Sequence, residues 1–245
     1  MDNNKTGIVE VSKSFGRQTV IDKVSLALNP KEVTCVVGRS GTGKSVLLKI
    51  LMGLERADSG TVHLMGTDIT RGAQPGLDEA RKQVGFLFQQ AALYDSMTIE
   101  ENVAFPLRRH RKLGASEINN RVQKLLASVG MTEAGAKFPS QISGGMKKRV
   151  GLARALALEP GLVLFDEPTA GLDPIASSEI AKLIVDLRDS RGVTCLVVTH
   201  DLVTARKTAN RIITLDGGKI IFDGSLDDFE RSSHPFITQY LKDAA

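Results

Sequence analysis

The chain has 245 residues, of which 42% are hydrophobic and 24% are charged, a balance that is ordinary for a soluble globular protein with a sizeable core. A formal net charge of +4 is too small to indicate a nucleic-acid partner, and the absence of Trp with an aromatic content of 4% disfavours a surface on which bases stack. The apolar runs stop well short of the roughly 20 residues that cross a bilayer, and the polar start at 1–5 does not resemble a secretory signal, so we expect a cytoplasmic protein.

The first part of the sequence predicts mixed α and β structure. Residues 7–28 alternate apolar and polar side chains, which is typical of antiparallel strands, here joined by a turn at 15–18. The pattern then predicts, in chain order, a buried strand at 33–37, a helix at 46–54, a strand at 60–64, loops at 66–69 and 72–76, and a strand at 84–88.

The rest of the sequence predicts a helical region followed by a return to alternating strands and helices. These elements are helical structure over 97–135, a helix at 150–158, a strand at 162–165, a helix at 177–188, a strand at 193–199, and a hairpin of 212–215 and 219–222 around 216–218. The sum is an α/β fold with a mostly parallel core sheet, an N-terminal antiparallel β-layer and a helical insertion. Cys35 and Cys195 each lie in an apolar strand pattern, so we expect buried thiols rather than a disulfide or a metal site.

One segment, 38–45, has the spacing of a glycine-rich phosphate loop and lies between an expected buried strand and an expected helix. It reads Gly38, Arg39, Ser40, Gly41, Thr42, Gly43, Lys44 and Ser45. The glycines allow backbone N–H groups to turn toward phosphates, Lys44 can reach the terminal phosphates, and the Ser45 hydroxyl can hold Mg²⁺. A chance glycine-rich turn would have to supply the spacing, the strand, the helix and the Lys-Ser pair together, so the segment predicts a nucleoside triphosphate site.

A second group of candidate residues follows the apolar run 162–165. The run fits a parallel strand that is covered on both faces, and two carboxylates, Asp166 and Glu167, stand at its end. Asp166 would then face the Mg²⁺ held by Ser45, while Glu167 could polarise a water in line with the γ-phosphate. A solvated acidic turn is the common alternative for an isolated Asp-Glu pair, but the phosphate loop makes nucleotide hydrolysis the better interpretation.

The third motif is Ser143, Gly144 and Gly145, followed by Met146, Lys147, Lys148 and Arg149. The Ser-Gly-Gly segment opens a helix, so its free N–H groups and dipole form an anion site. Taken with the phosphate loop and the Asp-Glu pair, the motif resembles the signature of the ATP-binding cassette (ABC) ATPases, and the resemblance covers nearly the whole chain. It implies that two chains sandwich two ATP molecules head to tail, with Mg²⁺, and that Ser143, Gly144 and Gly145 contact the ATP of the opposite protomer.

The resemblance assigns four further positions. Gln89 matches the glutamine that senses Mg²⁺ and the attacking water, and Asp173 matches the loop that crosses the dimer interface. His200 matches the switch histidine that contacts the γ-phosphate and helps Glu167, although a lone His at a strand end is usually a surface residue. Phe15 matches the aromatic that stacks on adenine, although a Phe in an amphipathic strand is more often part of a core.

The resemblance also implies one ABC domain over 1–245. Its parts would be a RecA-like core with the β-layer at 1–90 and 158–222, a helical subdomain with the signature at about 91–157, and a helical tail at 223–245. Translation factors of this family carry two cassettes, and its repair proteins carry long insertions. This sequence shows neither, and so it most resembles the separate ATPase subunit of a transporter, which would dock on an integral membrane permease near residues 90–109.

Finer resemblances concern the transported substrate. Met146 after Ser-Gly-Gly, together with the segments 88–95, 102–107 and 234–241, is similar to the ATPases of the Mla-type phospholipid transporters associated with Mce-domain proteins. In that group the C-terminal tail contacts the other ATPase protomer, but here it could equally be a capping helix that starts at Ser233. Ile142 departs from the Leu that is usual in the signature, which is a conservative change.

The resemblance to the Mla type implies a peripheral ATPase homodimer on the cytoplasmic face of an inner membrane, powering phospholipid transport that maintains outer-membrane lipid asymmetry. Its expected partners are the permease, an Mce-domain protein and a small STAS-domain subunit. One alternative is the ATPase of a lipoprotein-release, cell-division or multidrug system, whose signatures more often continue with Glu-Gln-Gln-Arg. Another is a soluble cassette that assembles iron–sulfur clusters, which would form complexes with soluble partners alone.

Overall fold

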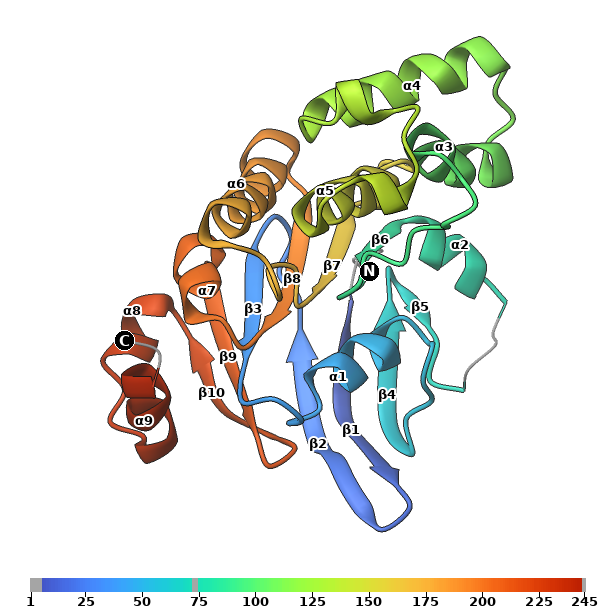
Figure 1. Cartoon of the computed structure of the whole chain (residues 1–245). Helices are drawn as coiled ribbons and strands as arrows, with labels where there is room; N and C mark the ends of the chain where they lie inside the picture. Colours follow the sequence, from blue (N-terminus) through green and yellow to red (C-terminus); the bar gives the residue numbers. More distant parts are fainter. Residues whose placement is uncertain (1–5, 72–74, 244–245) are drawn as a thin grey trace.

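The computed structural model describes residues 6–71 and 75–243, so the polar start at 1–5 and most of the loop expected at 72–76 lie outside the described residues. Two β-sheets face one another with a helix between them, and further helices cover the opposite face of the larger sheet (Figure 1). This arrangement confirms the expected α/β class. In the described ranges no helix combines the length and the apolar character needed to cross a membrane.

The smaller sheet is antiparallel, with the strand order β2-β1-β4-β5. Its strands are β1 (Gly7–Phe15), β2 (Gln18–Ala27), β4 (Ser59–Leu64) and β5 (Thr67–Asp68). The loop expected at 66–69 was therefore wrong in part, because Thr67 and Asp68 pair with Leu64 and His63 of β4. A strand of two residues is too short to produce an alternating pattern in the sequence.

The larger sheet has the strand order β10-β9-β3-β8-β7-β6. The strands are β3 (Val33–Val37), β6 (Val84–Leu87), β7 (Leu162–Asp166), β8 (Thr194–Thr199), β9 (Arg211–Asp216) and β10 (Lys219–Gly224). All neighbours are parallel except β9 and β10, which form the predicted hairpin. Every residue of β3 and β7 is buried, as the continuous apolar runs predicted for strands covered on both faces.

The helix between the sheets is α1 (Lys44–Leu51), which follows β3 through the phosphate loop. Its residues Leu47, Leu48, Ile50 and Leu51 are buried in a core that contains side chains from both sheets, among them Ile8 of β1 and Leu164 of β7. The N-terminal end of α1 is therefore fixed by packing on two sides.

The opposite face of the large sheet is covered by α5 (Gly144–Ala155), α6 (Pro174–Arg191) and α7 (Leu202–Thr208). Beyond α5 lie α3 (Ile99–His110) and α4 (Ala115–Ser128), which form the helical region expected over 97–135 (Figure 1). The 3₁₀ turns η1 (Thr132–Ala134) and η2 (Pro139–Gln141) connect α4 to α5. Thr98 starts α3 with a capping box, in which its side chain accepts from Glu101 and the Glu101 carboxylate accepts from the Thr98 N–H.

The helix α8 (Leu226–Glu230) lies within the helical tail expected at 223–245, but two other short helices, α2 (Leu77–Lys82) and α7, were not predicted. Each is too short for a helical repeat to be distinguished from a loop. The last helix, α9 (Pro235–Asp243), begins close to the predicted start at Ser233, and it packs on its own chain, with Ile237 and Tyr240 in the core. Cys35 and Cys195 are free and buried, as expected, and burial raises the pKa of each thiol to about 12.

Candidate functional site

The phosphate loop lies at the carboxyl end of β3, where it turns into α1. Gly43 has φ +97°, and a Cβ at this position would lie 2.8 Å from the Val20 carbonyl oxygen, so glycine is required where the loop passes β2. The Lys44 ammonium donates to the carbonyl oxygens of Gly38 and Arg39, at 2.9 Å each. The loop thus already surrounds a buried positive charge.

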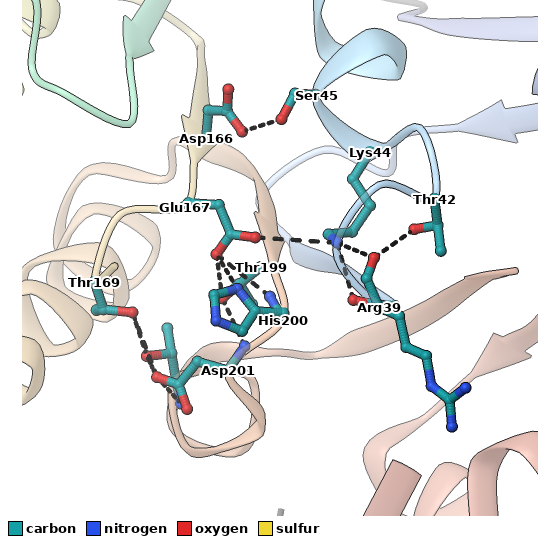
Figure 2. A network of polar contacts seen from close by, with 12 residues as sticks. Arg39, Thr42, Lys44, Ser45, Asp166, Glu167, Thr169, Thr199, His200 and Asp201 are labelled. Atoms are coloured by element: carbon teal, nitrogen blue, oxygen red, sulfur yellow. Dashed lines mark hydrogen bonds and ion pairs between the residues drawn. The ribbon is translucent and has the colours of Figure 1, made fainter. Parts of the chain in front are cut away.

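Two carboxylates approach this loop from the end of β7 (Figure 2). The Ser45 hydroxyl donates to Asp166 Oδ1 at 2.7 Å, and Lys44 Nζ lies 4.0 Å from Glu167 Oε1. Burial lowers the pKa of Lys44, an effect that Glu167 and Asp166 oppose. Burial also raises the pKa of Asp166, and the hydrogen bond from Ser45 acts in the opposite direction.

These side chains suit a magnesium ion. Mg²⁺ prefers oxygen ligands, and it usually takes one or two from the protein and the others from phosphates and water. The hydroxyl of Ser45 and the carboxylate of Asp166 provide such a pair, and Asp166 is a buried carboxylate that a cation would stabilise. The donor set therefore fits the ion that the sequence predicted.

Glu167 is held by contacts on both its backbone and its carboxylate. Its φ of +46° is unusual for a residue with a side chain, and its N–H donates to the Val198 carbonyl at 2.9 Å. Glu167 Oε2 accepts from the Thr199 hydroxyl at 3.2 Å and from the His200 N–H at 3.3 Å, and it lies 2.9 Å from His200 Nδ1 (Figure 2). The His200 side chain is 52% exposed, so its ring lies at the surface of the site.

Lys148 also belongs to this site, although no pattern in the sequence predicted it. Its ammonium is buried and donates to the Glu167 carbonyl oxygen at 2.9 Å, which connects the helix after the signature to the backbone of the acidic residue. Burial lowers the pKa of Lys148 to about 8, against the attraction of Asp166 and Glu167. Within a Lys-Lys-Arg run nothing distinguishes this lysine from a solvated one.

Thr199, Asp201 and Thr169 form a second missed group, next to His200 (Figure 2). The Asp201 carboxylate caps α7 by accepting from the N–H groups of Val203 and Thr204, and it also accepts from the Thr169 hydroxyl at 3.4 Å. An Asp before an apolar run is a helix-start signal that could have revealed α7. The cap fixes the chain immediately after His200.

The residues predicted to act on the opposite protomer lie apart from this cluster. Ser143 is the N-cap of α5 and accepts from the Met146 N–H at 3.3 Å, and Asp173 caps α6 by accepting from the N–H groups of Ile175 and Ala176 at 2.9 Å. Ser143, Gly144 and Asp173 are exposed. Across the described residues, no hydrogen bond or ion pair joins them to the phosphate loop of the same chain.

Gln89 and Phe15 are also exposed. Gln89 lies in the turn after β6, and the described part of the chain contains no hydrogen bond from it to Ser45 or Asp166. Phe15 ends β1, is 48% exposed, and has the Lys13 ammonium 5.1 Å from its ring centroid. The alternative that Phe15 is a core residue is therefore wrong, and its contact with adenine stays a prediction.

Known proteins resemble this chain in both sequence and fold. A family model described as "ABC transporter" matches residues 21–170, and a shorter match at 135–206 is to a model described as an AAA domain, putative AbiEii toxin, Type IV TA system. A dimeric structure of the ATP-binding cassette MJ0796 in a post-hydrolysis state, bound to ADP and Pi, has a TM-score of 0.83 and 31% identity, with 90% of this chain and 98% of that chain covered.

Relatives with curated names differ in the transport system they serve. The probable ribonucleotide transport ATP-binding protein mkl of Mycobacterium tuberculosis is 42% identical over 94% of this chain, and the methionine import ATP-binding protein MetN of Rhizobium johnstonii is 40% identical over 89%. This chain spans 64% and 60% of their lengths. The intermembrane phospholipid transport system ATP-binding protein MlaF of Escherichia coli is 37% identical, over 97% of this chain and 88% of MlaF. The chain therefore belongs to the ABC transporter family, as an ATP-binding cassette of the type that uses ATP with Mg²⁺.

Proposed function

We propose that this cassette hydrolyses ATP at the cluster formed by Lys44, Glu167 and His200. The observation that carries the proposal is the position of the Glu167 carboxylate, with one oxygen 4.0 Å from the Lys44 ammonium and the other 2.9 Å from the His200 ring. The carboxylate is thus directed toward the loop that would hold the phosphates. A carboxylate that can accept a proton from water and a cation that can offset phosphate charge are groups that promote phosphoryl transfer to water.

Each side chain has a role in this proposal. Lys44, now bonded to the loop carbonyls of Gly38 and Arg39, would donate to the terminal phosphates. Ser45 and Asp166 would hold Mg²⁺, which when bound offsets negative charge on the phosphate oxygens. Glu167 would accept a proton from the water that attacks the γ-phosphorus, ADP would leave, and His200 would hold a γ-phosphate oxygen.

The same proposal assigns the exposed signature to a second copy of the chain. Ser143 and Gly144 lie at the N-terminal end of α5, where free N–H groups favour an anion. Two apolar side chains near the predicted interface are also exposed: Ile175, two residues after Asp173, is 75% exposed, and Val203, three residues after His200, is 52% exposed. A head-to-tail dimer would cover both and would bring each signature to the ATP of its partner.

We further propose that the dimer drives a membrane permease which transports phospholipid. The similarity to MlaF supports this substrate, together with Met146 in the signature. A docking surface for the permease is supported by Tyr94 and Phe105, which pair with ring centroids 5.0 Å apart while 44% and 36% exposed. Arg154 supports the loop beneath them by donating to the carbonyl oxygens of Ala91 and Ala92.

The test is affinity purification of tagged Glu167→Gln protein from detergent-solubilised cells, with mass spectrometry of its partners and extraction of bound lipid. We expect a permease with many membrane spans, an Mce-domain protein and phospholipid. Recovery of a permease of another type, such as one for ribonucleotides or methionine, would leave the ATPase proposal standing and overturn the proposed substrate. Recovery of soluble partners alone would favour an assembly ATPase. As a control, wild-type protein is purified in parallel, which identifies partners whose binding depends on the trapped nucleotide state.

A further inference from the structure

The C-terminal helix α9 lies against both loops of the proposed catalytic cluster. Tyr240 is buried, with 6% of its surface exposed, and its hydroxyl donates to the His200 carbonyl oxygen at 2.7 Å. Burial raises the pKa of Tyr240 to about 12, and a backbone hydrogen bond with Gly38 opposes this rise. One phenol thus lies at the junction of the phosphate loop and the turn that carries His200.

A second set of contacts joins α9 to the phosphate loop. The Arg39 guanidinium lies 5.4 Å from the ring centroid of Phe236 and 3.8 Å from the Asp243 carboxylate. Phe236 in turn stacks on Tyr240, with ring centroids 5.8 Å apart. Arg39 and Asp243 are more than half exposed, so their ion pair contributes little by itself and serves mainly to orient the loop side chain.

The contact with His200 bears directly on Glu167. The N–H of His200 donates to the Glu167 carboxylate, while the carbonyl of the same residue accepts from Tyr240. His200 is therefore held at its N–H, its ring and its carbonyl. The contact at the carbonyl comes from Tyr240 of α9, which lies 40 positions further along the chain. The turn after β8 cannot move relative to Glu167 without moving or breaking the bond to α9.

We propose that α9 acts as a strap that fixes the His200 turn relative to the phosphate loop, with Tyr240 as a positioning residue for ATP hydrolysis. The proposal rests on the roles proposed above for Glu167 and His200. Tyr240 does not touch the reacting atoms. It acts through the His200 backbone, so it should affect the rate of the hydrolysis step more than the binding of nucleotide.

The experiment compares Tyr240→Phe with wild type in the full chain. Phenylalanine keeps the ring that packs in the core and removes the hydroxyl that donates to His200. We expect kcat to fall by about threefold to tenfold, the range that corresponds to the loss of one hydrogen bond, with KM for ATP unchanged. The affinity for a fluorescent ADP analogue should stay close to that of wild type, and the melting temperature should fall by only a few degrees, as the loss of one hydrogen bond predicts.

Three further variants make the result decisive. Lys242→Ala changes an exposed residue of the same helix and should leave all four quantities unchanged. His200→Ala should lose most activity, and adding Tyr240→Phe to it should cost little more, because the phenol acts through His200.

A normal kcat in Tyr240→Phe, together with a strong loss of activity in His200→Ala, would overturn the strap inference and leave the proposed role of His200 standing. Full additivity of the two changes would also overturn it, as would a fall in melting temperature and ADP affinity that accounts for the lost rate. If His200→Ala itself kept full activity, the proposed role of His200 would fail, and the strap proposal with it.

Discussion

At the scale of single residues, the two oxygens of the Glu167 carboxylate have different surroundings, which suits the role of base proposed for this residue. One of its oxygens takes three contacts from Thr199 and His200, and the other lies toward Lys44. The first oxygen is thereby oriented, while the second keeps lone pairs that, in the proposed mechanism, would accept a proton from water. The positive φ of Glu167 is a local backbone cost of about 1–3 kcal/mol that the surrounding bonds offset.

Replacing Glu167 by Gln tests whether this carboxylate acts as the base. Glutamine keeps the size of the side chain and an acceptor oxygen, but a neutral amide cannot take the proton from the attacking water. We expect steady-state hydrolysis to fall by at least about 100-fold, with ATP affinity near that of wild type. Phosphate release and equilibrium binding of a labelled ATP measure the two quantities. Hydrolysis at the wild-type rate would exclude Glu167 as the base.

At the scale of elements, most strands were predictable, whereas the short strand β5 and several contacts of the site were not. The segments 33–37 and 162–166 are strands buried on both faces, so their apolar runs stand out, and the phosphate loop has a local spacing that needs no tertiary information. Lys148 and Tyr240 contact residues that lie 19 and 40 positions away in the chain. Their burial depends on how α5 and α9 dock on the core, which no local pattern encodes.

At the start of α6, the contribution of Asp173 to helix stability can be separated from its proposed role in the dimer. Asp173 accepts from two N–H groups at the N-terminus of this helix, and the resemblance also assigns it to the dimer interface. Asp173→Ala should lower the free energy of unfolding by about 1 kcal/mol, because the cap is lost. Asp173→Asn should keep most of that stability, since asparagine caps as well as aspartate.

Urea denaturation measures the stability of both variants, and ATPase assays on the same samples measure function. A rate that falls in Asp173→Asn while stability is kept would support a role across the interface. Equal stability of Asp173→Ala and wild type would contradict the importance of the cap.

At the scale of the whole molecule, the exposed signature is the reason why the proposed site needs two chains. Ser143 and Gly144 have no hydrogen bond to the phosphate loop of their own chain in the described ranges, whereas Lys44, Ser45, Asp166 and Glu167 are already assembled around it. The cassette MJ0796, which shares this fold, has been solved as a dimer. Nucleotide binding to the loop and the proposed completion of the site by a partner should therefore be separable by experiment.

Glu167→Gln should therefore form a dimer with ATP and Mg²⁺ and return to monomer with ADP. Adding Ser143→Ala should weaken this ATP-dependent dimer while leaving nucleotide on the phosphate loop, because the proposed dimer places the lost hydroxyl at the γ-phosphate bound by the other chain. Light scattering after size-exclusion chromatography gives the mass, and absorbance gives the bound nucleotide. An ATP-dependent dimer as stable as that of Glu167→Gln alone would remove Ser143 from the interface.

The position of α1 between the two sheets has a consequence for how nucleotide occupancy can be measured. The helix that carries Lys44 and Ser45 shares one hydrophobic core with β1, β2 and β4 on one side and with the large sheet on the other. A ligand that binds its N-terminal end stabilises the folded state by RT ln(1 + [L]/Kd). Because both sheets pack on this helix, this gain in stability should raise the melting temperature of the two layers together. Heat denaturation should therefore report nucleotide occupancy in the absence of a membrane, a permease or ATP hydrolysis.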